Sequence, residues 1–270
     1  MASLPSLFIT RAGLWDDLLR LGIARGDMVM VHAAMSRAGR LLNGPDALIG
    51  ALRGATGPDG TILAYTDWDA RYEDLLDSQG RVPEAWREHI QPFDPNASRA
   101  VRENGIFAEF LRTTPGARRS GNPGASVTAV GAQAEWVTAD HPLDYGYGEG
   151  SPLAKLVSAS GKVLMVGAPL DTMTLLHHAE HLARIPGKRV RRIEVPFAAA
   201  SGVQWRMVEE FETALPVISG LDDRYFAVIV EEFLATGQGA RGPVGDALAT
   251  LVEAAGITDF AVEWLESRFR

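Results

Sequence analysis

Three side chains past the middle of the chain have the types and spacing that acid–base or metal chemistry requires. His177, Glu180 and His181 stand in the run LLHHAEHLAR, residues 175–184. On a helix, residues three and four apart share one face. The spacing His-x-x-Glu-His can mean a zinc hydrolase, with two histidine ligands and a glutamate base. The same face suits a general base, His177, oriented by a carboxylate. A solvated surface patch is the third interpretation, because short motifs often match by chance.

Carboxylates and aromatic rings alternate in AYTDWDARYEDLLD, residues 64–77, directly after a predicted strand. Strand ends are where α/β folds tend to place their sites. Aromatic faces and carboxylates together bind polycations through cation–π contacts and charge-assisted hydrogen bonds. An acidic surface loop with partly buried aromatic residues gives the same pattern.

The run EEFE, residues 209–212, brings further carboxylates together. On a strand, Glu210 and Glu212 share one face. Like charges this close repel unless a cation lies between them. The alternative is a strand edge that keeps both carboxylates in water.

Three glycine-bearing turns, VHAAMSRAG, GARRSGNPGAS and ARGPVG, combine small residues, backbone amides and an arginine. A pyrophosphate and a pantetheine arm require such surroundings. None of the three matches a P-loop or a dinucleotide fingerprint, and taken singly each is a turn.

Composition narrows the classes of function. The chain has 270 residues, 46% of them hydrophobic, and can bury a sizeable core. A net charge of −8 disfavours a nucleic-acid partner and favours a cationic ligand. The absence of cysteine excludes disulfides, a thiol nucleophile and cysteine-bound zinc, and indicates a reducing compartment. Without a signal-like start or an apolar run of bilayer length, the sequence predicts a cytoplasmic protein with no membrane contact.

Short apolar runs alternate with amphipathic stretches, which predicts an α/β fold with a mixed sheet and flanking helices. We expect one domain over residues 1–270, with an inserted subregion at about 67–101, since so long a connection is usually functional. The expected strands are 28–33, 61–66, 126–131 and 162–168, with a hairpin of RVRRIEVPF and VQWRMVEEFE joined at Ser201 and Gly202. The expected helices run from about 10 to 25, from Pro45 to before Gly54 and Gly57, around His177, and over about 222–234 and 244–253.

The order of several strings carries more than any one of them. They are GDMVMVHAAMSRAG, GPDGTILAYTDWD, PFDP, GARRSGNPGASV, EGSP, GAPLDTMTLLHHAE, RGPVG and EWLE. Together they resemble the aminoglycoside 3-N-acetyltransferase family from near residue 10 to the C-terminus. The resemblance implies transfer of an acetyl group from acetyl-CoA to the 3-amino group of a 2-deoxystreptamine aminoglycoside such as gentamicin. It also implies a family-specific fold, distinct from the commoner acetyltransferase fold, and antibiotic resistance, because acetylation removes a charge that binds RNA phosphates.

The resemblance also assigns roles. His177 is the general base for direct transfer in a ternary complex, a role worth about 10²- to 10⁴-fold. Glu180 orients or charge-balances the imidazole, or else binds an ammonium of the drug. The residues implied at the aminoglycoside cleft are Tyr65, Trp68, Asp69, Tyr72, Glu73, Glu210 and Glu212. Those implied at acetyl-CoA are His32, Ala33, Ala34, Met35, Ser36, Arg37, Arg119, Ser120, Gly242, Pro243, Val244 and Gly245.

The chain departs from the family pattern at three places. Asn122 stands where relatives have the histidine of Ser-x-His-Pro, Ala34 where many have a hydroxyl residue, and His178 where they have tyrosine. On this interpretation, His181 creates the zinc-like spacing by accident, and we expect no metal. A zinc-dependent hydrolase and a non-catalytic binder of cationic antibiotics stay open as alternatives. As to assembly, we expect a monomer or a homodimer.

Overall fold

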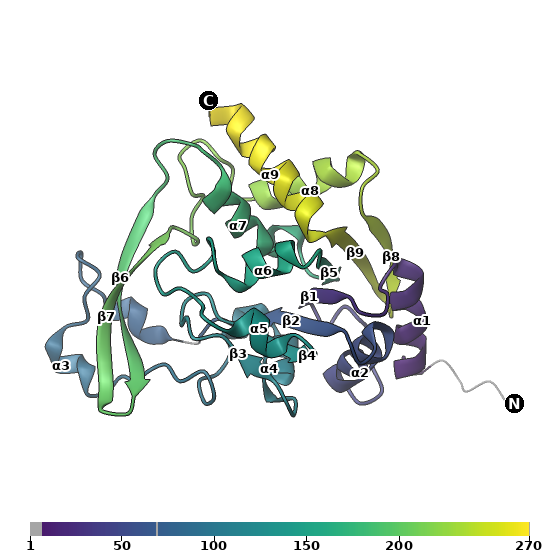
Figure 1. Cartoon of the computed structure of the whole chain (residues 1–270), viewed down its shortest axis with the longest axis horizontal. Coiled ribbons are helices and arrows are strands. Elements are labelled where there is room, and N and C mark those ends of the chain that lie inside the picture. Colours follow the sequence, from purple (N-terminus) through teal and green to yellow (C-terminus); the bar gives the residue numbers. More distant parts are fainter. Residues whose placement is uncertain (1–6, 69, 270) are drawn as a thin grey trace, which may run out of the picture.

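A seven-stranded mixed sheet forms the centre of the part of the chain that the structure describes (Figure 1). This structure is a computed structural model, and it describes residues 7–68 and 70–269. The strand order is β3-β4-β2-β1-β5-β9-β8, in which β1 runs parallel to β2 and β5 and the other pairs are antiparallel. The strands are β1 Met28–Ala33, β2 Thr61–Tyr65, β3 Arg118–Arg119, β4 Val127–Gly131, β5 Lys162–Val166, β8 Ala240–Val244 and β9 Ala247–Glu253. The predicted α/β fold class with a mixed sheet is confirmed.

Helices cover both faces of this sheet, because its central strands are apolar on both sides. In β1, Met28 and Met30 belong to one buried cluster, and Val29 and Val31 belong to the other. Burying each such side chain contributes about 1.5–3 kcal/mol, and a strand buried on both faces has a continuous apolar sequence. The helices on the Val29 face are α1 Arg11–Leu21, α2 Pro45–Thr56 and α4 Ile106–Thr113. Those on the Met30 face are α5 Ala134–Thr138, α6 Pro152–Ser158, α7 Leu175–Leu182, α8 Tyr225–Ala235 and α9 Ala254–Phe269. None of these helices, within the described residues, has both the length and the apolar run that a membrane span needs.

The predicted hairpin is present and stands apart from the sheet, at the left of Figure 1. It consists of β6 Val190–Ala199 and β7 Gly202–Phe211. Its inner side packs on the segment that follows β2, in a third apolar cluster built around Tyr72 and Val208. The short helices of that segment and of the loops are η1 Arg71–Leu75, α3 Glu84–Arg87, η2 Arg102–Asn104 and η3 Leu170–Thr172. The hairpin and the segment therefore fold onto each other beyond the carboxyl end of β2.

Two predicted helix ends move by a few residues. Thr10 caps α1 as expected, accepting a hydrogen bond from the backbone N–H of Gly13 at 3.2 Å. However, α1 already ends at Gly22, whose φ of 115° lies in the left-handed region that stops a helix. Gly54 lies inside α2, and only Gly57 lies beyond its end.

The helix predicted over residues 244–253 is wrong. Val244 ends β8, and Ala247–Glu253 form β9, which pairs antiparallel with both β5 and β8. Alanine and leucine favour a helix locally, but the pairing on both sides of β9 overrides this preference. Because β9 is buried among its neighbours, its sequence also lacks the alternation that marks a half-buried strand. The helix begins later, as α9, and no helix was predicted there.

Candidate active site

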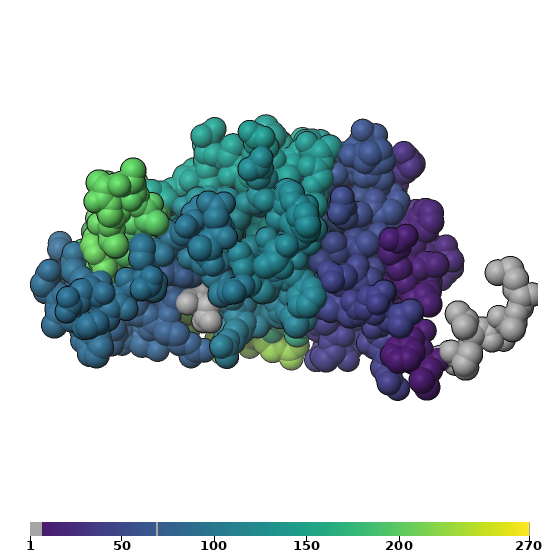
Figure 2. Space-filling view, turned by 90° about the horizontal axis from the view of Figure 1, so that it is seen from below, coloured from purple at the N-terminus to yellow at the C-terminus, as the bar shows by residue number. Residues whose placement is uncertain are grey.

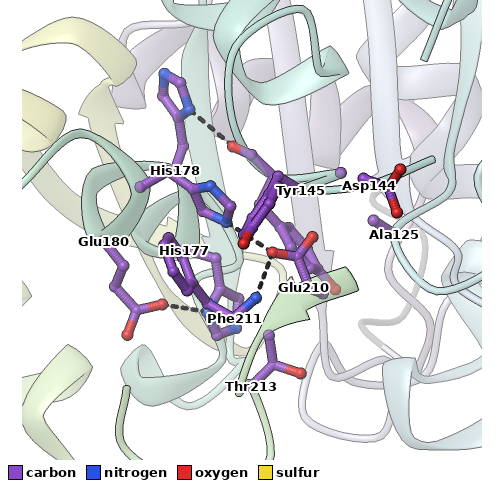
Figure 3. Close-up of polar contacts among 12 residues, drawn as sticks. Ala125, Asp144, Tyr145, His177, His178, Glu180, Glu210, Phe211 and Thr213 are labelled. Atoms are coloured by element: carbon purple, nitrogen blue, oxygen red, sulfur yellow. Dashed lines mark hydrogen bonds and ion pairs between the residues drawn. The ribbon is translucent and has the colours of Figure 1, made fainter. Parts of the chain in front are cut away.

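A histidine–glutamate pair lies on α7, which follows β5 and η3. His177 Nδ1 lies 2.6 Å from Glu180 Oε2, as the three-residue spacing on one helix face predicted. Glu180 is 1% exposed, and its other oxygen accepts a hydrogen bond from the Tyr225 hydroxyl. Figure 3 shows the carboxylate turned toward His177. When Nδ1–H donates to this carboxylate, the lone pair of the imidazole lies on Nε2, the atom that is left to act as a base.

Aromatic rings hold the His177 imidazole from two sides. The ring centroids of Tyr147 and Phe226 lie 5.0 and 4.9 Å from its own. Next to it, His178 is buried and uses Nδ1 to contact the backbone carbonyl of Tyr147 at 2.8 Å. His178 therefore fixes the backbone that carries the Tyr147 ring.

His181 belongs to a different contact from His177. Its Nε2 lies 2.9 Å from Glu210 Oε1 on β7, while His177 contacts Glu180. Among the described residues, no three His, Asp or Glu side chains form a group that could hold a metal ion. The two histidines of the zinc-like spacing thus face separate carboxylates instead of a common point. The expectation that the protein needs no metal stays a prediction.

An acidic cleft lies between the end of β2, the segment after it and the hairpin. Three carboxylates line it, those of Asp67, Glu73 and Glu210, together with the rings of Tyr65 and Tyr147. Only one arginine, Arg191, is among the described residues of the lining, and it pairs with Glu73 at 2.7 Å. The apolar part of the lining includes Leu143, Ile193, Val195, Val208 and Phe211. Carboxylates beside aromatic faces make this cleft suited to a cationic ligand.

Two tyrosines lie between this cleft and the pair formed by His177 and Glu180. The hydroxyls of Tyr65 and Tyr147 share a hydrogen bond of 2.6 Å, and each lies within hydrogen-bond distance of the Gly124 carbonyl, at 3.2 and 2.9 Å. Burial raises the pKa of both phenols well above their ordinary value, so they stay protonated. Tyr147 was missed in the sequence, although the aromatic run DYGYGEG was a usable signal.

Asp67 is the second residue that the sequence analysis left out of the site, although it stands in the quoted acidic run. Burial, reinforced by the charge of Glu73, raises its pKa to about 7, against the opposing hydrogen bond from the Trp68 amide. Its backbone has φ of 49°, in the left-handed region, which asparagine and aspartate tolerate best. A nearby cation would favour the charged form of this carboxyl.

The predicted aminoglycoside residues fall into three groups. Tyr65, Glu73 and Glu210 line the cleft. Trp68 and Tyr72 pack together in the apolar cluster beneath the cleft, with their ring centroids 5.5 Å apart, and so support the loop from below. Glu212 lies just past the end of β7, where its carboxylate accepts the backbone N–H groups of Thr213 and Ala214, so the paired face expected for Glu210 and Glu212 does not form. Asp69 lies outside the described residues.

The predicted CoA residues fall into two separate groups. Residues 32–37 and 242–245 come together, since the Asp246 amide bonds the Ala38 carbonyl at 3.1 Å and Arg37 bonds the Gly167 carbonyl at 2.8 Å. Arg37, Arg241, Asp246 and Leu248 line a groove there. Arg119 and Ser120 lie at and just after β3, an edge strand of the sheet.

The side chains of Ser120, Asn122 and His32 are buried or partly buried. The Ser120 hydroxyl accepts the Val127 amide at 2.9 Å and contacts His141 Nδ1 at 2.8 Å. Asn122 accepts from the amides of Gly124 and Ala125 and donates to two backbone carbonyls, so it shapes the Gly124 turn. Burial lowers the pKa of His32 to about 4, which keeps it neutral, and its Nε2 is buried without a hydrogen-bond partner.

Comparison with known proteins identifies close relatives. A family model described as aminoglycoside 3-N-acetyltransferase matches residues 30–266. The chain is 48% identical over 264 residues to aminoglycoside N(3)-acetyltransferase III of Pseudomonas aeruginosa, covering 96% of the chain and 94% of the relative. Among solved structures it resembles AAC-IIIb in binary complex with CoASH, at 68% identity and a TM-score of 0.96, with 97% and 98% of the two chains covered. AAC-VIa bound to sisomicin is 37% identical, with a TM-score of 0.92 and coverage of 97% and 99%.

Proposed function

The chain belongs to the aminoglycoside 3-N-acetyltransferase family. We propose that it transfers the acetyl group of acetyl-CoA directly to the 3-amino group of a 2-deoxystreptamine aminoglycoside. In this proposal His177 is the general base. Membership confirms the resemblance seen in the sequence and the family-specific fold. The observation that carries the mechanism is the 2.6 Å contact between His177 and buried Glu180 beside an acidic cleft. The CoA and sisomicin complexes of the two relatives support both ligands.

The chemistry requires a base because a protonated amine has no lone pair. His177 Nε2 takes a proton from the amine as the amine nitrogen attacks the thioester carbonyl carbon. The new N–C bond forms, the C–S bond breaks, and the electron pair leaves with the CoA sulfur. Glu180 stabilises the imidazolium that forms on His177, and the proton then passes to solvent or to the thiolate.

The cleft accounts for binding and for product release. Asp67, Glu73 and Glu210 face a ligand that carries several ammonium groups, and they favour its charged form. Acetylation replaces one ammonium by a neutral amide, so the product is held less strongly than the substrate. The same loss of charge weakens the drug's attraction to RNA phosphates, which is the physical basis of resistance.

Acetyl-CoA is assigned to the groove formed by residues 32–37 and 242–245. Arg37 and Arg241 line the groove and can donate hydrogen bonds to its phosphates, although Arg241 also pairs with Glu231 of the same lining at 2.7 Å. In β1, His32 lies two residues beyond Met30, which pairs with Leu63, so it stands abreast of Tyr65 on the Met30 face of the sheet. A thioester reaching past His32 would therefore approach the Tyr65, Tyr147 and His177 group.

The test is thiol release from acetyl-CoA by the purified protein with gentamicin as acceptor. The variant His177→Ala should lose about 10²-fold or more in kcat. The variant His89→Ala is the matched control, because His89 is an exposed histidine in the long segment that follows β2. Mass spectrometry and NMR of the product should place one acetyl group on the 3-amino nitrogen. Turnover by His177→Ala equal to that of the control would refute the proposed base.

A further inference from the structure

Arg119 has contacts unlike those of a CoA ligand. Its Nε donates to the Ser126 hydroxyl at 3.0 Å, one terminal nitrogen donates to the Ser98 carbonyl at 2.5 Å, and the other donates to the Asp67 carbonyl. The central carbon of its guanidinium, Cζ, lies over the Phe93 ring, 5.0 Å from the ring centroid. Burial lowers its pKa to about 10, so it stays charged at neutral pH. All three nitrogens thus donate within the protein.

We propose that Arg119 is a positioning residue that holds the acidic wall of the aminoglycoside cleft, and that it does not bind CoA. The inference rests on the proposed function of that cleft. Asp67 and Ser98 stand near the two ends of the segment that leaves β2 and returns before η2. Arg119 binds both carbonyls at once and so closes the base of this long loop, next to the bond from the Val101 amide to the Thr66 carbonyl, 3.1 Å.

The same guanidinium reaches the second wall of the cleft through Phe93. The Phe93 amide donates to the Pro196 carbonyl of β6 at 2.8 Å, and its carbonyl accepts from the Ala198 amide at 3.0 Å. Figure 2 shows the blue loop lying against the green hairpin. Arg119 therefore supports one unit made of the loop, which carries Asp67 and Glu73, and the hairpin, which carries Glu210.

Asp67 depends on this support most directly. Its amide donates to the Ser126 carbonyl at 3.0 Å, and its carbonyl accepts from both Ser126 and Arg119. These bonds hold a backbone with φ of 49° and so aim the carboxylate at the cleft. Loss of the guanidinium would free the Asp67 backbone and move a carboxylate that faces the drug, while the groove formed by residues 32–37 and 242–245 stays unchanged.

Loss of the Arg119 guanidinium should affect the KM values of the two substrates differently. In Arg119→Met and Arg119→Lys we expect KM for gentamicin to rise about tenfold or more, since small misplacements of binding groups are costly. KM for acetyl-CoA should stay within about twofold, because uniform binding of that substrate is untouched. Lysine keeps the charge and one donor and should rescue part of the loss. Arg118→Met is the matched control, because Arg118 is the exposed neighbour on the same strand and points to the other face of β3.

Two further measurements do not depend on turnover. Calorimetry should show weaker gentamicin binding by Arg119→Met and unchanged CoA binding. Hydrogen exchange should rise in residues 67–101 and not in β1 or β5. A rise in KM or Kd for the CoA substrate with gentamicin unaffected would overturn the proposal, as would exchange raised equally throughout the molecule. If the wild-type protein binds gentamicin but releases no thiol, only the proposed function is refuted. The binding and hydrogen-exchange results would still decide the role of Arg119.

Discussion

The variant Glu180→Gln is the most direct test of the proposed catalytic pair, because it removes one charge and little volume. The 2.6 Å contact between Glu180 Oε2 and His177 Nδ1 places the centre of an imidazolium about 4 Å from the carboxylate. At an effective dielectric constant of about 20, that separation corresponds to about 4 kcal/mol. Each 1.36 kcal/mol is a factor of ten, so kcat should fall about 10³-fold. Both KM values should stay within about threefold, because the lost interaction grows only as the imidazolium forms.

Two other variants calibrate this result. Tyr225→Phe removes the other hydrogen bond to Glu180 and keeps the charge, so kcat should fall only about tenfold through poorer aim of the carboxylate. Glu232→Gln is the control, since Glu232 accepts from the Trp264 indole at 2.9 Å on α8 and lies outside the site. The assay is steady-state thiol release with each substrate varied in turn. If Glu180→Gln keeps its kcat and instead raises KM for gentamicin, Glu180 binds a drug ammonium and the assignment is wrong.

Three more outcomes follow from the charges and histidines of the structure. Because the pKa of Asp67 is raised to about 7, the affinity for gentamicin should increase as pH rises through about 7, and binding should release protons. The variant Asp67→Asn should abolish that part of the pH dependence. Calorimetry in two buffers of different ionisation enthalpy measures the released protons. Burial lowers the pKa of His141 to about 4, so its contribution to folding, about 3 kcal/mol, is complete above about pH 6.5 and is lost as pH falls toward 4. Denaturant titrations at pH 7 and 5 should therefore show that the free energy of unfolding falls less on acidification in His141→Gln than in the wild type. The raised pKa of Asp67 has the opposite effect on this free energy, and it has that effect equally in the wild type and the variant. Excess chelator should leave turnover unchanged, and activity that returns only with added zinc would restore the hydrolase interpretation.

Local patterns in the sequence determined the contact between His177 and Glu180 and most of the elements. The contact between His177 and Glu180 follows from their spacing, because residues three apart on a helix are neighbours whatever surrounds them. The strand MVMVHA and the hairpin were readable for the same reason, since their apolar runs and turn residues act over short distances. The acidic and aromatic composition of the loop after β2 likewise indicated a cationic ligand.

Only the tertiary structure decided which distant side chains meet. The Tyr65 and Tyr147 hydroxyls, 82 residues apart in the sequence, meet at the Gly124 carbonyl. Arg119 contacts the loop after β2 because the sheet brings β3 close to Asp67, 52 residues away in the sequence. The run that became β9 has the composition of a helix, yet hydrogen bonding to strands on both sides outweighs that preference. Long-range pairing depends on the packing of the whole sheet, and a pattern of adjacent residues does not contain it.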